Sequence, residues 1–312
     1  MTNNIIPSGG NSSVIVSAGE ILYDIFPGYK RLGGAPFNFI YHIRRLLGDG
    51  YLLSRIGADG PGQEILSRLT SENIPVDFIE IDSVHPTGTA IVEINESSEP
   101  GFIITEDCAY DFIRATPGIR NLLDQGCGLF YYGTLAQRSS TSREAIQSLW
   151  GYNTKYFYDV NIRQHFFNEK LLRASLRAAD VVKVNLEELQ LLNELLLGEP
   201  FETINTARRL MSEFRIDMFC VTMGSNGACL LKGDEIDRHK VLVDNVVDTV
   251  GAGDAYSAIL ATGYLMGWDL KRINEIACEF AAGICRVSGA LSEDDAFYAH
   301  FRSLIAGPES TR

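Results

Sequence analysis

The sequence predicts an α/β fold in which helices cover both faces of a mostly parallel sheet. Short apolar runs alternate with helical patterns along the chain, and most of these runs lack polar alternation. Strands of this kind are buried on both faces, and strand–helix alternation implies right-handed crossover connections. The longest charge-free apolar stretch near the C-terminus, Ala255–Trp268, contains glycines and is shorter than the ~20 residues of a membrane span.

Six segments are predicted to be strands because they are short and rich in β-branched or aromatic residues. They are Val14–Ser17, Gly50–Ile56, Leu129–Tyr132, Tyr156–Val160, Val181–Asn185 and Met218–Thr222. The predicted helices are Asn38–Leu47, Gly62–Glu72, Ser142–Leu149, Asn168–Ala178, Leu186–Leu197, Thr203–Phe214, Ala252–Met266 and Leu270–Val287. Because open α/β sheets bind ligands beyond the carboxyl ends of their strands, we expect functional residues directly after these strands.

One region interrupts the alternation. Thr87–Asn95 and Gly101–Thr105 resemble the two strands of a β-hairpin, with a turn-like segment between them at Glu96–Pro100. The stretch Ile21–Leu32 has a similar non-helical character. We therefore expect these segments to form a small second sheet beside the main one.

The charge balance restricts the function. The 312 residues include 27 Lys and Arg against 40 Asp and Glu, a formal net charge of −13. Such an acidic surface repels phosphate backbones and anionic lipids, which argues against a nucleic-acid or membrane-surface partner. The six cysteines form no Cys-x-x-Cys pair, so we expect reduced thiols and no zinc site. The first basic residue is Lys30, and we expect no signal peptide.

The segment Asp248–Asp254, with the sequence DTVGAGD, opens a predicted apolar helix. Small residues allow a tight turn and leave backbone amides free at a helix N-terminus, where developing negative charge is stabilised. A carboxylate in that first turn, Asp254, is placed to take a proton from a hydroxyl group. The residues alone leave open a simpler interpretation, in which Asp254 only caps the helix.

A second glycine-rich segment, Leu32–Asn38 with the sequence LGGAPFN, opens another predicted helix. Paired glycines let a backbone approach a ligand closely, and Asn38 offers a donor and an acceptor to a sugar hydroxyl. Taken alone, the segment is more typical of a turn followed by a helix cap.

The two segments together resemble the two signatures of PfkB-type, ribokinase-like sugar kinases. The similarity continues in the same order through Arg55–Gly62 (RIGADGPG), Asp159–Arg163 (DVNIR), Lys183–Glu188 (KVNLEE) and Val221–Gly227 (VTMGSNG). The resemblance implies one ribokinase-like domain over residues 1–312, a three-layer α/β/α sandwich with a mostly parallel central sheet. It also implies lid segments at about 21–33 and 85–108, inserted in the main α/β core, which form a small β-sheet over the sugar.

Members of this family transfer the γ-phosphate of ATP to a hydroxymethyl group of a sugar or nucleoside. By resemblance, Asp254 is the catalytic base that deprotonates the attacking hydroxyl. The backbone amides of Gly251, Ala252 and Gly253 form the anion hole for the transferring phosphoryl group.

The resemblance also assigns residues to the nucleotide and to metals. Asn185 and Glu188 match a pair that organises Mg²⁺ and phosphate, largely through water. The nucleotide-side loop is matched by Thr222, Gly224 and Gly227. Asp248 and Val250 lie where the family often binds potassium through a carboxylate and backbone carbonyls. The implied cofactors are therefore ATP and Mg²⁺, with K⁺ as a further candidate.

Sugar contacts are implied at Asp24, Gly33, Gly34, Asn38 and Arg163. Asp24 matches an aspartate that accepts hydrogen bonds from sugar hydroxyls. Arg163 matches an arginine of the fructokinase and ketodeoxygluconate kinase branches, and its planar guanidinium suits a phosphate or a carboxylate. A homodimer formed through the lid sheets follows only by analogy. A cytoplasmic location is expected from the need for ATP.

The first motif and the DVNIR string favour the fructokinase branch, so fructose is the first expected acceptor. The alternatives are 2-keto-3-deoxygluconate, a nucleoside or another small sugar and, from another class, a catalytically silent sugar- or nucleotide-binding regulator. Ile40 and Ile259 stand where the family usually has small residues, and they either pack against neighbouring elements or reshape the pocket. We expect His42, inside a helix, to be a packed or surface residue rather than a sugar ligand.

Overall fold

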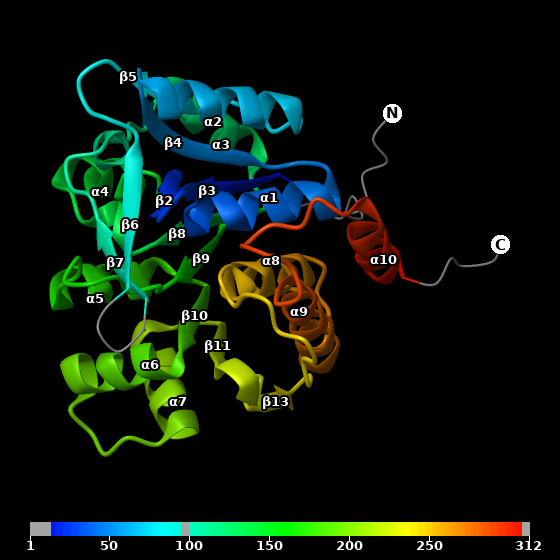
Figure 1. Cartoon of the computed structure of the whole chain (residues 1–312). Coiled ribbons are helices and arrows are strands. Elements are labelled where there is room, and N and C mark those ends of the chain that lie inside the picture. Colours follow the sequence, from blue (N-terminus) through cyan, green and yellow to red (C-terminus); the bar gives the residue numbers. More distant parts are fainter. Residues whose placement is uncertain (1–13, 95–99, 308–312) are drawn as a thin grey trace.

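A nine-stranded sheet lies at the centre of the molecule, in a computed structural model that describes residues 14–94 and 100–307 (Figure 1). Its strand order is β13-β12-β11-β10-β9-β8-β1-β4-β5. The strands are β1 (Ile15–Ala18), β4 (Tyr51–Gly57), β5 (Ile79–Asp82), β8 (Leu129–Gly133), β9 (Lys155–Asp159), β10 (Val181–Asn185), β11 (Met218–Thr222), β12 (Ala228–Lys232) and β13 (Glu235–His239). All pair in parallel except β12 and β13, which continue one edge in antiparallel pairing.

Helices cover both faces of this sheet and complete the three layers seen in Figure 1. One face carries α1 (Ala35–Leu47), α2 (Gly60–Ser71), α8 (Ala252–Leu265), α9 (Leu270–Ile284) and α10 (Asp295–Ala306). The other carries α3 (Pro117–Gly126), α4 (Ser140–Gln147), α5 (Glu169–Ala178), α6 (Leu186–Leu192) and α7 (Thr203–Phe214). Neighbouring strand residues point to opposite faces, so Tyr131 joins the first core and Phe130 the second. The predicted α/β/α sandwich is confirmed.

The predicted second sheet is present as well. It has the order β3-β2-β6-β7 and consists of β2 (Leu22–Phe26), β3 (Tyr29–Gly33), β6 (Gly88–Ile94) and β7 (Pro100–Ile104). β2 pairs in parallel with β6, whereas β2–β3 and β6–β7 are antiparallel hairpins. Residues 96–99 of the predicted turn lie outside the described residues, as do both ends of the proposed domain 1–312.

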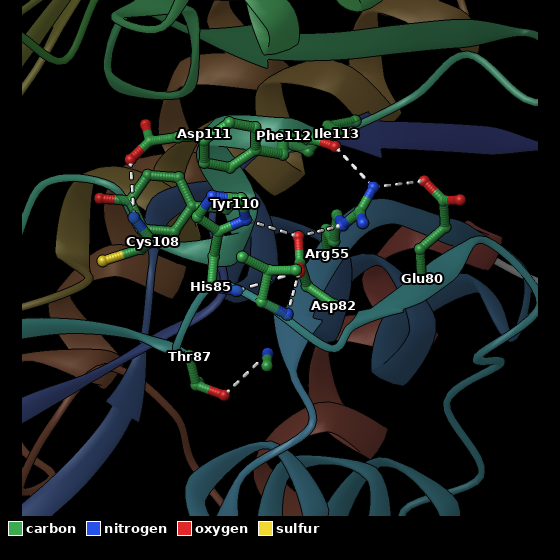
Figure 2. A network of polar contacts seen from close by, with 12 residues as sticks. Arg55, Glu80, Asp82, His85, Thr87, Cys108, Tyr110, Asp111, Phe112 and Ile113 are labelled. Atoms are coloured by element: carbon green, nitrogen blue, oxygen red, sulfur yellow. Dashed lines mark hydrogen bonds and ion pairs between the residues drawn. The ribbon is translucent and has the colours of Figure 1, made fainter.

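A polar network holds both connections of the small sheet against the main sheet (Figure 2). Arg55 on β4 has its Nε 2.8 Å from Asp82 Oδ2 at the end of β5, and its Nη1 donates to the carbonyl of Phe112 at 3.0 Å. Asp82 also accepts from the backbone amide of His85, whose ring stacks on Phe112 with centroids 3.6 Å apart. The chain entering β6 and the chain leaving β7 are thereby fastened together at β4.

Sequence analysis did not predict β5, β12, β13, α3 and α10. Strand β13 reads EIDRH and is largely exposed at the sheet edge, so it contains no apolar run. Helix α10 begins at the acidic cluster Glu293–Asp295, with Asp294 as its N-cap. Within residues 14–94 and 100–307, none of the helices combines the length and apolar character needed to cross a membrane.

Candidate active site

A cavity of about 850 Å³ lies where the carboxyl ends of the parallel strands meet the small sheet. Its wall contains Glu20 after β1, Arg163 after β9, Asn185 at the end of β10 and Thr222 at the end of β11. On one side of β1 the sheet continues with β4 and β5, and on the other side it continues with β8, β9, β10 and β11. Open α/β sheets bind ligands at such a reversal of strand order, so the cavity is the candidate active site.

The fold brings the sequence-predicted site residues together. All of them except Gly33 and Asp248 line this cavity, although they come from segments spread over more than two hundred residues. Gly33 lies next to the side chain of Asp24, and a Cβ atom at Gly33 would be 2.8 Å from Asp24 Oδ2. Asp248 lies just outside the lining, and its carboxylate is paired with Arg31. The individual roles of these residues stay predictions.

Asp254 stands in the first turn of α8, beside the backbone of Gly251–Gly253. The helix is capped by Gly251 with φ +78° and without a side-chain hydrogen bond, so Asp254 does not act as the cap. Asn38 Nδ2 donates to Asp254 Oδ2 at 2.8 Å. Burial and the nearby charge of Asp159 raise the pKa of Asp254 to about 6, which leaves it a base at neutral pH.

Gly34 leaves room for Glu20 at the end of the cavity that is predicted to bind the sugar. Gly34 has φ +107°, and a Cβ atom there would lie 2.5 Å from the carbonyl oxygen of Glu20. Glu20 is almost fully buried, and its Oε2 has no hydrogen-bond partner among the described residues. Burial raises the pKa of Glu20 to about 7 and that of Asp24 to about 6, while the charge of Arg163 opposes both shifts. Sequence reasoning gave Glu20 no role.

A buried ion pair beneath the Gly251–Gly253 turn was also missed. Lys183 Nζ lies 2.8 Å from both carboxylate oxygens of Asp159, and it would lie 3.5 Å from a Cβ atom at Gly253. Asp159 also accepts from the hydroxyls of Tyr131 at 3.0 Å and Ser257 at 2.8 Å. The sequence did contain a signal for this pair. A lysine and an aspartate each occur in an apolar strand, and a charge that is buried in this way is retained only when it is paired.

The side of the cavity that is predicted to bind the nucleotide contains a reciprocal helix cap. Asn185 Oδ1 accepts from the Glu188 amide at 2.8 Å, and Glu188 Oε2 accepts from the Asn185 amide at 2.8 Å. The other Glu188 oxygen accepts from the Ile162 amide at 2.8 Å. Within the described segments, no three His, Cys, Asp or Glu residues are grouped to hold a metal directly. Asn185 and Glu188 line the cavity, and oxygen groups of this kind suit Mg²⁺ held through water.

The two glycines of the nucleotide-side loop differ in their surroundings. A Cβ atom at Gly227 would lie 2.0 Å from the carbonyl oxygen of His239, so the close approach of β13 requires this glycine. Gly224 has φ +55° and nothing within 4 Å of a Cβ position. The hydroxyl of Thr222, at the start of this loop, donates to the carbonyl of Val184 at 3.3 Å.

The unusual isoleucines are packing residues. Ile40 and Ile259 are fully buried in the core on the α1–α8 face and do not line the cavity. A Cβ atom at Gly50 would lie 2.8 Å from Ile40 Cδ1, so a glycine in the neighbouring segment accommodates the large side chain. His42 is buried too, with Nδ1 2.9 Å from the Tyr298 hydroxyl, and burial lowers its pKa to about 3. It is a packed histidine.

The family model for pfkB family carbohydrate kinases matches residues 28–296. The chain belongs to this family. This pfkB kinase is 27% identical over 302 residues to a putative sugar kinase, PH1459, of Pyrococcus horikoshii, covering 89% of this chain and 92% of that protein. It is 27% identical over 276 residues to an Escherichia coli fructokinase, covering 83% and 87% of the two chains.

Solved structures agree with this assignment. The structure of PH1459 in complex with ATP aligns with a TM-score of 0.74 at 26% identity, over 88% of this chain and 93% of that chain. A double mutant of Vibrio cholerae fructokinase, bound to fructose, ADP and a potassium ion, has a TM-score of 0.73 at 22% identity, over 92% and 97%. The latter likeness shows the fold alone. This pfkB kinase is a phosphotransferase that acts on a sugar hydroxyl.

Proposed function

We propose that this kinase transfers the γ-phosphate of ATP to a hydroxymethyl group of a neutral sugar, with fructose as the first candidate. The observation that carries the proposal is the position of Asp254. It lies in the cavity, oriented by Asn38, next to the Gly251–Gly253 turn, whose residues also line the cavity. A base and an anion hole then face the same reacting group, as phosphoryl transfer requires.

In this proposal the acceptor hydroxyl gives its proton to Asp254 as its oxygen attacks the γ-phosphorus. The amides of Gly251–Gly253, at the positive end of the α8 dipole, stabilise the charge on the transferring phosphoryl group. Asn185 and Glu188 would hold Mg²⁺ through water. Mg²⁺, when bound, supplies neutralising charge to the phosphates. We infer a cytoplasmic location, because this activity needs a supply of ATP.

The sugar end favours a neutral, hydroxyl-rich acceptor. Glu20, Asp24 and Asn38 all present oxygen acceptors there, which suit the donor hydroxyls of a ketose. An acidic sugar would meet the carboxyls of Glu20, Asp24 and Asp254, whose negative charge the guanidinium of Arg163 opposes. That arginine is exposed at the cavity wall, and it is the observation that keeps 2-keto-3-deoxygluconate as the second candidate.

The test is ADP release from Mg-ATP with a panel of sugars, sugar acids and nucleosides. We expect fructose or another neutral sugar to give the highest kcat/KM, and Asp254→Asn to remove that signal in a folded protein. A higher kcat/KM for 2-keto-3-deoxygluconate, lost in Arg163→Gln, would overturn the neutral-sugar assignment and keep the kinase. Ligand binding without turnover across the panel would instead support the catalytically silent regulator.

A further inference from the structure

Arg31, on lid strand β3, reaches from the small sheet to the loop that precedes the catalytic helix. Its Nη1 donates to Asp248 Oδ2 at 2.8 Å, and its Nη2 donates to the Ser288 hydroxyl at 2.6 Å. The rings of Phe26 and Tyr29 stack on each other, and their centroids lie 5.3 and 5.1 Å from the guanidinium carbon. The aromatic pair favours the cation and restricts its position.

Asp248 holds the loop before α8 in place. Its Oδ1 accepts from the Val250 amide at 3.1 Å, and its Oδ2 accepts from the Gly289 amide at 3.1 Å. Three residues after Asp248, a Cβ atom at Gly251 would lie 2.3 Å from Ala290 Cβ. The loop that carries the anion hole and the loop that follows α9 are therefore packed against each other. Arg31 links both loops to the lid.

Arg31 is also close to the predicted sugar-binding residue Asp24 on the neighbouring strand β2. It pairs directly with Asp24 across the β2–β3 hairpin, so the two side chains lie on the same face of the small sheet. The charge of Arg31 helps to offset the rise that burial causes in the pKa of Asp24. Arg31 is therefore the cross-strand neighbour of the predicted sugar-binding aspartate and the ion-pair partner of the aspartate that fixes the anion-hole loop.

The predicted potassium site at Asp248 and Val250 does not fit this arrangement. Both oxygens of the Asp248 carboxylate already accept hydrogen bonds, and one of them carries the ion pair with Arg31. A free monovalent cation on that carboxylate would have to displace the guanidinium. Because arginine stays protonated at every relevant pH, the guanidinium charge is always present.

We propose that Arg31 is a positioning residue that supplies Asp248 with a tethered positive charge in place of a potassium ion, and so couples the lid to the anion-hole loop. The inference rests on the phosphotransferase activity and not on the identity of the sugar. The kinase should accordingly work without a free monovalent cation, and the requirement for one should appear when the guanidinium is removed.

The first test compares the wild-type enzyme in K⁺, Na⁺ and tetramethylammonium buffers of equal ionic strength. We expect kcat to change by less than about twofold, because the Asp248 charge is already paired. Activation by K⁺ of about tenfold or more, which corresponds to ~1.4 kcal/mol, would overturn the proposal.

The second test replaces the guanidinium. In Arg31→Gln we expect kcat to fall by about 10²-fold through misplacement of the anion hole, with a smaller change in KM for ATP. K⁺ or free guanidinium ion should restore much of the loss, and Arg31→Lys should retain part of the activity. Lys30→Gln is the matched control, because Lys30 lies on the same strand and pairs with Glu64 at the surface. An Arg31→Gln enzyme with wild-type kcat and no response to K⁺ would refute the role.

A readout other than activity separates this inference from the proposed function. The thermal midpoint of Arg31→Gln should rise with K⁺ but not with tetramethylammonium at equal ionic strength, whereas the wild-type midpoint should respond to neither. An equal K⁺ response in both proteins would contradict a tethered cation. If the wild type phosphorylates no acceptor, the proposed sugar is wrong. The comparison of the thermal midpoints of the wild type and Arg31→Gln in K⁺ and tetramethylammonium still decides the role of Arg31. If Arg31→Gln does not fold, Arg31→Lys and the wild-type cation series decide it.

Discussion

The side-chain amide of Asn38 donates to Asp254 Oδ2 at 2.8 Å and joins the first turns of two helices 216 residues apart in sequence. This contact orients the carboxylate and favours its charged form. In Asn38→Ala we therefore expect the pKa of Asp254 to rise and the acidic limb of the kcat/KM profile to move to higher pH. The measurement is the pH dependence of kcat/KM for the best acceptor. An unmoved acidic limb would show that the hydrogen bond does not tune the base.

Replacement of the proposed base has a distinct signature. Asp254→Asn keeps the size of the side chain but cannot accept the proton, so kcat should fall by about 10²–10⁴-fold, the usual contribution of general-base catalysis. ADP release measures the effect, and circular dichroism checks that the protein is folded. Near-normal turnover in this variant would remove Asp254 from the catalytic role.

Activity and stability should respond to pH in opposite directions. Protonation of Asp254, with its pKa raised to about 6 by burial, should reduce kcat/KM as the pH falls through about 6. The pKa values of Glu20 and Asp24 are also raised, so the folded state binds protons more readily than the unfolded chain does. These three groups stabilise the fold at low pH, and that stability is lost as the pH rises through their folded-state pKa values.

The matching experiment measures urea unfolding and kcat/KM from about pH 7 to about pH 5. Asp59 and Asp82, whose pKa values are lowered, titrate below this range. Burial lowers the pKa of His42 to about 3, so this residue loses stability as the pH falls, and it offsets the gain from the three acids only in part. We expect activity to decline without a fall in the free energy of unfolding. A parallel decline of both quantities would mean that unfolding, rather than protonation of the base, limits activity.

The buried ion pair should be costly to break on one side. Lys183→Met leaves Asp159 buried without its partner, so we expect destabilisation of about 3–5 kcal/mol. Adding Asp159→Asn to that variant should recover much of the loss, because no uncompensated charge remains. Urea unfolding of both proteins provides the comparison. Lys155→Met is the control, since its ion pair with Asp180 is partly exposed to solvent and should contribute at most about 1 kcal/mol. Equal losses in Lys183→Met and the control would contradict the argument.

Gly34 should tolerate no side chain. Gly34→Ala adds a Cβ atom 2.5 Å from the Glu20 carbonyl oxygen at φ +107°, which should cost about 1–3 kcal/mol of backbone strain and displace Glu20. Gly60→Ala is the control, because a Cβ atom at Gly60 has nothing within 4 Å and that residue has no positive φ. Thermal unfolding of both variants measures the difference. Equal stability would show that the Glu20 segment can shift without cost.

Local pattern was sufficient for much of the fold. Apolar runs such as Val181–Asn185 and Met218–Thr222 became strands with the predicted bounds, because a strand buried on both faces is recognisable from composition alone. Strand β13 escaped prediction, since an exposed edge strand has no such signature. The ordered motifs also placed Asp254, Asn38 and Glu188 in one family pattern before any contact between them was known.

What the sequence determined by itself was the order of elements, the family and the segments that supply the site. The tertiary structure decided which charges meet: Lys183 with Asp159, and Arg31 with Asp248. It also decided that Ile40 packs over Gly50 and not into the cavity. The physical reason is range. Periodicity and turn chemistry act over a few neighbouring residues, whereas ion pairing and packing depend on distances between segments that only the folded chain brings together.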